Sequence, residues 1–220
     1  MGSTCKRCGT CCAKGGPTLH RADLPLLRQG FLTVGDLITI REGEPVYSPL
    51  SHGNEASRQE LIKVAGRSDS WRCRFFLEGE GACGIYDHRP LECRLLKCWD
   101  PTDLTDIVYQ ECLTRQDVLP ADDKLAPLIE IQEAHCSFAT LSILAEEYRA
   151  GNTEGLAAIE RLVTLDLNIR ASARQIRGLT LDEELVTFGR PLFKSLSFYQ
   201  LAIQEGPYGI RVRPLTPSSG

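Results

Sequence analysis

The sequence lacks three features that would assign it to a broad class of protein at once. It has no apolar run near the length of about 18 residues that a membrane helix needs. Its first twelve residues contain no apolar stretch of the kind that marks a secretory signal. Basic side chains are not in surplus, because 25 Lys and Arg stand against 29 Asp and Glu, a net charge of −4. We therefore expect a cytoplasmic protein with neither a nucleic-acid nor a membrane partner.

Motifs for nucleotide binding and catalysis are also missing from the sequence. No glycine-rich loop follows a predicted strand, so the sequence offers no Rossmann-type site for a nucleotide or for S-adenosylmethionine. Gly79 and Gly81 form only an isolated G-x-G in an acidic turn. The C-terminal half contains no nucleophile and base at a recognisable spacing. Whether the protein is an enzyme, which residues would be catalytic, which protein partner it has and its oligomeric state all stay open.

Cysteine, by contrast, is abundant and unevenly placed, with ten residues in a chain of 220 and none after position 136. They are Cys5, Cys8, Cys11 and Cys12, then Cys73, Cys83, Cys93 and Cys98, and finally Cys112 and Cys136. A cytoplasmic protein has no oxidising compartment in which to pair them. Thiols at gaps of two and three residues can converge on one metal ion at a small entropic cost.

The first cluster reads C-K-R-C-G-T-C-C, in which Gly9 permits a tight backbone turn between the second and third cysteines. Buried free thiols and a disulfide framework are the alternatives to metal binding here. The lack of a secretory signal argues against disulfides. Four further cysteines downstream favour metal binding over isolated buried thiols.

The second cluster spans residues 71–100 and mixes local structures. Residues 71–77 are aromatic and partly alternating, which predicts a short strand, and residues 78–81 read as a turn. A short helix through Leu91 and Leu95 follows, with Asp87 as its expected cap. Cys93 and Cys98 would point about 140° apart on one helix, so both can face one ion only if the helix ends near Lys97.

Residues 5–100 thus carry a specific combination of motifs. These are the C-x-x-C-x-x-C-C run, then Gly15-Gly16-Pro17, then Cys73-x9-Cys83-Gly84-Ile85-Tyr86, then Arg89-Pro90-Leu91-x-Cys93-Arg94 and Cys98. In these motifs the sequence resembles the CxxCxxCC family, the YkgJ-type cysteine-cluster proteins. The resemblance implies a domain that chelates zinc or iron through all eight cysteines. It also implies a distant relationship to the flagellin lysine N-methylase. Cys112 and Cys136 lie outside the resemblance, and we interpret them as small buried residues.

The thiols suit either an iron–sulfur cluster or zinc. In the first case Cys5, Cys8 and either Cys11 or Cys12 would join one cysteine of the second cluster around a 4Fe-4S cluster, as in ferredoxin-type runs with one remote ligand. All-cysteine zinc sites pair two C-x-x-C knuckles, and the second cluster contains no C-x-x-C. The spacing therefore favours iron–sulfur over zinc, with spare thiols for a second ion.

Histidine and arginine add less to the predicted site. Of the four histidines only His88 lies inside a cluster, and we interpret it as a surface or helix-end residue. Four arginines interleave with the second cluster, where they either offset thiolate charge or form ordinary surface. They are Arg72, Arg74, Arg89 and Arg94, of which the last two lie within the motif.

The remaining pattern predicts an α+β protein: a small, irregular, metal-stapled N-terminal region of strands and loops, followed by a mostly α-helical C-terminal half. Short elements are expected at 22–29, 37–41 and 59–65, with a polar loop at 48–57. Apolar stripes predict helices at 131–148, 156–167 and 192–203. On a helix face, Asp166 and Arg170 are interpreted as a solvated pair.

These features predict a division into a cysteine-cluster metal-binding domain at 1–100, an acidic connector at 101–130, a helical region at 131–205 and a flexible tail at 206–220. Three functions follow as hypotheses. The first is a redox protein or enzyme that depends on an iron–sulfur cluster. The second is a structural zinc module for protein interaction. The third, which rests on the resemblance alone, is an S-adenosylmethionine-dependent protein lysine methylase.

Overall fold

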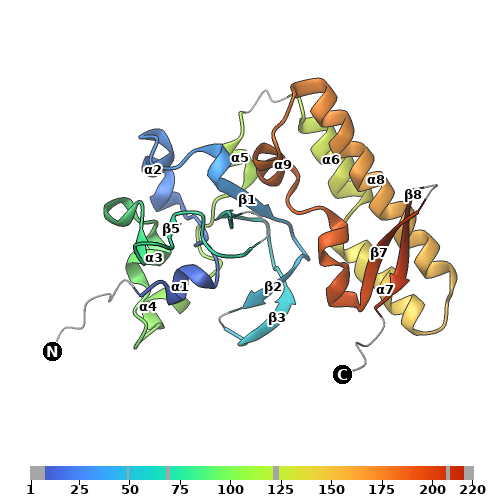
Figure 1. The fold of residues 1–220 in the computed structure, drawn as a ribbon, viewed down its shortest axis with the longest axis horizontal. Coiled ribbons are helices and arrows are strands. Elements are labelled where there is room, and N and C mark those ends of the chain that lie inside the picture. Colours follow the sequence, from blue (N-terminus) through green and yellow to red (C-terminus); the bar gives the residue numbers. More distant parts are fainter. Residues whose placement is uncertain (1–7, 49, 68–69, 121–123, 207–208, 216–220) are drawn as a thin grey trace.

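The computed structural model describes residues 8–48, 50–67, 70–120, 124–206 and 209–215. Short strand pairs and short helices make up the N-terminal half, and long helices dominate the C-terminal half (Figure 1). The predicted α+β class is therefore confirmed. Among the described residues, no helix combines the length and apolar character that a membrane span needs.

The N-terminal half is built from many elements of two to five residues, as expected for a chain interrupted by glycine and proline. With η for a 3₁₀ helix, they are α1 (Thr10–Ala13), η1 (Arg21–Asp23), α2 (Leu24–Arg28), η2 (Val34–Asp36), β1 (Leu37–Ile40), β2 (Pro45–Ser48), β3 (Gly53–Ala56), β4 (Leu61–Val64), β5 (Phe76–Leu77), β6 (Ala82–Cys83), η3 (Tyr86–His88), α3 (Leu91–Leu95), α4 (Thr102–Thr105) and α5 (Arg115–Val118).

The centre of this half is the antiparallel pair of β1 and β4, in register from Leu37 opposite Val64 to Ile40 opposite Leu61. Strands were predicted at both places. Every residue of β1 is buried: Leu37 packs in the N-terminal core, Ile40 packs with Leu61 and Cys112, and Thr39 donates to the carbonyl of Val186 in the C-terminal half. Thr18, just after the first cysteine cluster, bridges to Lys63 of β4. This pair therefore supports the segment that follows the cysteines.

Strands β2 and β3 form a hairpin where the sequence predicted a polar loop at 48–57. Pro45 pairs with Ala56 and Ser48 with Gly53. The residues of β2 and β3 are mostly half-buried or exposed. Their sequences therefore lack the alternation of apolar and polar residues that predicts a strand. In Figure 1 the hairpin projects between the cysteine-bearing segments and the C-terminal half.

The C-terminal half packs helices around one apolar core that includes Phe138, Ile159 and Phe188. Its elements are α6 (Ala126–His135), α7 (Phe138–Arg149), α8 (Glu154–Arg177), α9 (Leu181–Phe188), η4 (Leu192–Tyr199), β7 (Leu201–Gly206) and β8 (Gly209–Pro214). Helix α8 confirms the predicted second helix and extends it.

Three details of this half differ from the prediction. The stripe at 131–148 is two helices, because Ser137 caps α7 by accepting a hydrogen bond from Thr140 N. The stripe at 192–203 is η4 followed by β7. Residues 209–214, predicted to be part of a flexible tail, form β8 and pair with β7; residues 216–220 lie outside the described residues. The predicted domain boundaries themselves stay a prediction.

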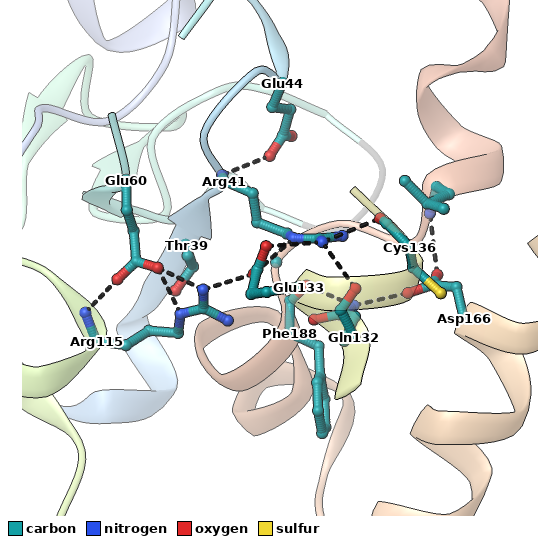
Figure 2. Close-up of polar contacts among 12 residues, drawn as sticks. Thr39, Arg41, Glu44, Glu60, Arg115, Gln132, Glu133, Cys136, Asp166 and Phe188 are labelled. Carbon is teal, nitrogen blue, oxygen red and sulfur yellow. Dashed lines mark hydrogen bonds and ion pairs between the residues drawn. The ribbon is translucent and has the colours of Figure 1, made fainter. Parts of the chain in front are cut away.

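A buried polar network joins the two halves (Figure 2). Arg41, at the end of β1, has no exposed side-chain surface and donates to both carboxylate oxygens of Glu133 on α6, at 2.8 and 2.9 Å. It also donates to Cys136 O at 3.0 Å. Arg115 on α5 donates to the same Glu133 carboxylate and to Glu60. Two guanidinium groups from the N-terminal half therefore share one carboxylate of the C-terminal half.

The network continues on α8 through a pair that was predicted to be solvated. Asp166 and Arg170 are instead buried, with Arg170 Nε donating to Asp166 at 3.1 Å. Arg170 also donates to Phe188 O and Gly189 O, the carbonyls that end α9. The spacing of four residues was read correctly. Burial depends on the C-terminal end of α9 lying against Arg170, which a helical pattern does not reveal.

Replacing Glu133 by Gln is expected to lower the free energy of unfolding by about 2 kcal/mol, because Arg41 and Arg115 then keep their charge without a full counter-charge. The loss is smaller than the 3–5 kcal/mol of a fully buried pair because 36% of the Glu133 side chain is exposed. Urea unfolding measures it. Glu130→Gln, an exposed change on the same helix, is the control and should change stability little.

The same pair of proteins tests the pH dependence. Burial raises the pKa of Glu133, but the hydrogen bond and charge of Arg41 and the charge of Arg115 outweigh it and hold the pKa below the usual 4.5. The ionised carboxylate therefore stabilises the fold above about pH 4.5, and this contribution is lost as the pH falls through the lowered pKa. The stability difference between wild type and Glu133→Gln should shrink below that pH. A difference that stays constant into the acid range would contradict the assignment.

Candidate metal centre

The first cysteine cluster turns into a short helix at Gly9. This glycine has a φ of 73°, in the left-handed region that other residues rarely adopt, so the turn favours glycine, and the ring of Phe76 packs where a Cβ would lie. The next residues form α1, which carries Cys11 and Cys12. Their sulfur atoms are 4.0 Å apart. Cys5 lies outside the described residues.

Backbone hydrogen bonds place the second cluster against the first. The N–H of Cys73 donates to Cys12 O at 2.8 Å, which joins two segments far apart in the sequence. Strand β5 then pairs with β6, with Phe76 opposite Cys83. Cys12, Cys73 and Cys83 are therefore brought together by main-chain contacts. The predicted strand at 71–77 is confirmed only at its last two residues.

Helix α3 carries Cys93, and a buried carboxylate holds its first turn. Asp23 has no exposed surface, and its Oδ1 accepts a hydrogen bond from Leu91 N at 2.8 Å. Asp23 thus satisfies a helix N–H that the sequence assigned to Asp87. The helix ends at Leu95, and Cys98 follows in a turn closed by a bridge between Lys97 and Asp100. The expected helix end before Cys98 is confirmed.

Glu92 fastens the other side of α3. Its Oε2 accepts from Thr18 N at 2.6 Å, and its Oε1 lies 3.6 Å from Nε2 of the buried His20. Burial by itself would raise the pKa of Glu92, but the contact with His20 and the charge of Lys63 outweigh burial and lower it. The carboxylate therefore stays ionised and links α3 to the segment that follows the first cluster.

Seven cysteines line one cavity of about 800 Å³. They are Cys8, Cys11, Cys12, Cys73, Cys83, Cys93 and Cys98, which together with Cys5 form the predicted ligand set. Cys8 and Cys98 are exposed, whereas Cys73 is buried and the others are partly buried. The cavity therefore has a thiol-rich interior and two thiols at its mouth.

The interior thiols affect one another electrostatically. Burial, followed by the charges of Cys11, Cys73 and Cys83, raises the pKa of Cys12 from 9.0 to about 12. Burial also raises the pKa of Cys93, with contributions from Cys73, Cys11 and Cys12. Without a cation these thiols hold their protons, and a bound metal ion would reverse that preference.

The described residues contain no group of three or more cysteine, histidine or carboxylate side chains already spaced for a single metal ion. What they contain is a set of seven thiols that line one cavity, and the soft donor set fits zinc or iron. We call Cys11, Cys12, Cys73, Cys83 and Cys93 the inner thiols.

His88 and the arginines of the second cluster mostly contact groups other than the thiols. The ring of His88 stacks on Phe31 with centroids 3.4 Å apart, and His88 does not line the cavity. Arg74 pairs with Asp36 and lowers the pKa of Cys73, although burial still raises that pKa overall. Arg89 lines the cavity and lies over the ring of Tyr86 at 3.6 Å.

Cys112 and Cys136 lie outside this cavity, as expected for packing residues. Cys136 is fully buried in the C-terminal core, and its thiol donates to Leu162 O at 3.8 Å. Cys112 packs with Ile40 and Leu61. Burial raises the pKa of Cys112 to about 11 and that of Cys136 to about 12. Both thiols are therefore neutral near pH 7.

Sequence analysis missed the residues that position the ligands and those that close the cavity. Asp23 and His20 carry no motif, and Glu92 was hidden between Leu91 and Cys93 in the predicted helix. Arg190 and Phe198 come from the C-terminal half, yet they line the same cavity as the cysteines. No local pattern could have found them, because only the tertiary fold brings them to the site.

Comparison with known families supports the metal-binding character of this region. The family model CxxCxxCC, described as "Putative zinc- or iron-chelating domain", matches residues 4–118. The match covers all eight cysteines of the predicted ligand set. No curated protein and no solved structure matches the chain.

Because the thiols of the cavity differ in exposure and pKa, we expect them to be alkylated at different rates in metal-free protein. At pH 8, Cys98 is expected to react with iodoacetamide at least about tenfold faster than Cys12 or Cys93, because Cys98 is exposed and the raised pKa of the other two suppresses the reactive thiolate. Peptide mass spectrometry over time measures the three rates. Circular dichroism before the reaction controls for folding. Equal rates in folded protein would mean that the two clusters do not converge in this way.

Proposed function

The chain belongs to the CxxCxxCC family, whose domain is described as zinc- or iron-chelating, and from this premise we propose that its cysteines hold an iron–sulfur cluster, of the 4Fe-4S type. The observation that carries the proposal is the ring of seven thiols around one cavity. A single ion draws its sulfur ligands to within about 4 Å of one another. A cluster places iron and sulfide between its ligands, and a wide ring of thiols is what it requires.

The inner thiols are the proposed ligands, with four of the five binding at one time. Cys11 and Cys73 each act electrostatically on both Cys12 and Cys93, which supports placing these four thiols near one another. Cys8 and Cys98, at the mouth of the cavity, could replace an inner thiol as ligand or bind a second ion. Cys5 belongs to the same C-x-x-C-x-x-C-C run. The raised pKa of Cys12, Cys73 and Cys93 means that binding a cluster through them releases protons, so that assembly is favoured by higher pH.

The other residues of the site hold the ligands and exclude water. Asp23 and Glu92 fix α3 so that Cys93 faces the thiols of the first cluster. Phe76, packed on Gly9, covers the turn between Cys8 and Cys11. A bound iron–sulfur cluster supplies one-electron transfer, or a Lewis-acidic iron where one ligand position stays open. This chain would thus act as a redox protein or as a cluster-dependent enzyme.

Structural zinc is the second candidate, and one distance favours it. The sulfur atoms of Cys11 and Cys12 are 4.0 Å apart, close to the separation of two thiolates on one tetrahedral zinc ion. In that role the metal would fasten the two clusters together and contribute directly to folding. The C-terminal half would then offer an interaction surface.

Protein purified without oxygen is expected to be brown, with a broad absorption band near about 400 nm and equal amounts of iron and sulfide. Cys93→Ala removes an inner thiol and should abolish the band. Cys112→Ala, also within the family domain but outside the cavity, is the matched control and should keep it. Absorption and metal analysis measure both variants.

The same samples separate the two candidates. Colourless protein that contains about one or two zinc ions, and that loses its N-terminal structure when a chelator removes them, would overturn the iron–sulfur proposal in favour of zinc. Loss of the band in Cys112→Ala as well as in Cys93→Ala would contradict the assignment of the inner thiols.

A further inference from the structure

Residues other than the cysteines also line the cavity that holds the thiols. They include Pro45 and Tyr47 of the hairpin, Trp71, and Arg190 and Phe198 of the C-terminal half, which together we call the aromatic end. The family model ends at residue 118, so this wall is partly built by a segment outside the family domain. We infer that this aromatic end is a substrate pocket, which takes an uncharged planar ring of a small organic molecule beside the metal centre.

The first support is a stack that fixes one wall. The guanidinium of Arg190 lies 4.4 Å from the ring centroid of Trp71. Arg190 also donates to Pro45 O at 3.2 Å and to the carboxylate of Glu44. Glu44 is completely buried. Trp71 is therefore held by a side chain that is itself locked in place, as a preorganised binding surface requires.

The second support is the exposure of the rings along this end. Tyr47, Trp71 and Phe198 are 60%, 48% and 40% exposed, although large aromatic side chains usually lie inside. They come from three separate segments and line one cavity. Exposed rings gathered on a concave wall are typical of small-molecule sites, whose volumes run from about 300 to 1,000 Å³.

The third support is charge, which decides the kind of ring. Arg190 is the cation of the aromatic end, and Glu44 neutralises it. The other cations on the cavity wall are Lys14, two residues after Cys12, then Lys63, which acts on Glu92, and Arg89, which lies over the ring of Tyr86. Lys63 and Arg89 are thus engaged with groups of the protein itself. An uncharged aromatic ring suits the neutral end, since a charged one would lose its hydration without a partner.

The inference deepens the proposed function and rests on it, because the pocket is a substrate site only if the neighbouring thiols hold a reactive centre. The ring would stack on the wall of Trp71 and Tyr47, with Phe198 on the C-terminal side. The C-terminal half would in this way select the substrate for a metal centre that the family domain provides.

Equilibrium dialysis of the metal-loaded protein with N-phenyl-1-naphthylamine, an uncharged polyaromatic probe, tests the pocket. One equivalent should bind. Trp71→Ala and Phe198→Ala should each raise Kd by about tenfold, the effect of losing one aromatic contact of about 1.4 kcal/mol. Ile143→Ala, an equally exposed apolar change on α7 away from the cavity, should leave Kd unchanged. The 8-sulfonate of the same probe should bind at least about tenfold more weakly.

Metal content and melting temperature of each variant are measured in the same samples. Variants that keep metal and stability but lose probe affinity support the pocket. A probe that binds Phe198→Ala as well as wild type, binds in several equivalents, or is weakened equally by Ile143→Ala overturns it. Equal binding of the sulfonate overturns the preference for an uncharged ring. If the protein binds the probe as expected but contains no metal, the proposed function is contradicted, and the pocket is a site for aromatic molecules without a metal centre.

Discussion

The buried carboxylate of Asp23 accepts hydrogen bonds from the N–H groups of His20 and Leu91, and the geometry of the cysteine site depends on these contacts. Burial raises the pKa of Asp23 despite both hydrogen bonds, so keeping this carboxylate ionised costs folding free energy. Its place is explained by what it joins: the segment after the first cysteine cluster and the helix that carries Cys93. With Glu92 it positions thiols from two distant parts of the chain before any metal binds.

Convergence of the thiols has an electrostatic consequence. Burial raises the pKa of Cys12 to about 12, and the charges of the neighbouring thiols Cys11, Cys73 and Cys83 add to that rise. A fold that gathers thiols in this way, with one nearby cation acting on Cys73, resists ionisation until a metal cation is supplied. The arginines that the sequence suggested as counter-charges serve mainly elsewhere: Arg72 pairs with Glu78, and Arg94 approaches Asp23.

The two halves of the molecule are joined by charged groups as well as by apolar packing. Arg41 and Arg115 share the carboxylate of Glu133 (Figure 2). Val186 of α9 packs into the N-terminal core. Since one partner of each buried pair comes from each half, separating the halves would leave charges without counter-charges. This attachment keeps Arg190 and Phe198 at the cavity, so that the metal centre and its surroundings form one site.

The sequence by itself determined the elements whose signals are local: strands β1 and β4, the helix of Cys93 and its end before Cys98, helix α8, and the family pattern of eight cysteines. It did not reveal the β2–β3 hairpin, whose strands lack apolar alternation. It also left β8 within a tail, although Ile210 and Val212 alternate there with Arg211 and Arg213. Only the tertiary structure decided that Asp166 and Arg170 are buried, that Asp23 caps α3, and that Arg190 lies on Trp71. The physical reason is that burial and contact depend on groups distant in sequence, whereas periodicity and ligand spacing are properties of neighbouring residues.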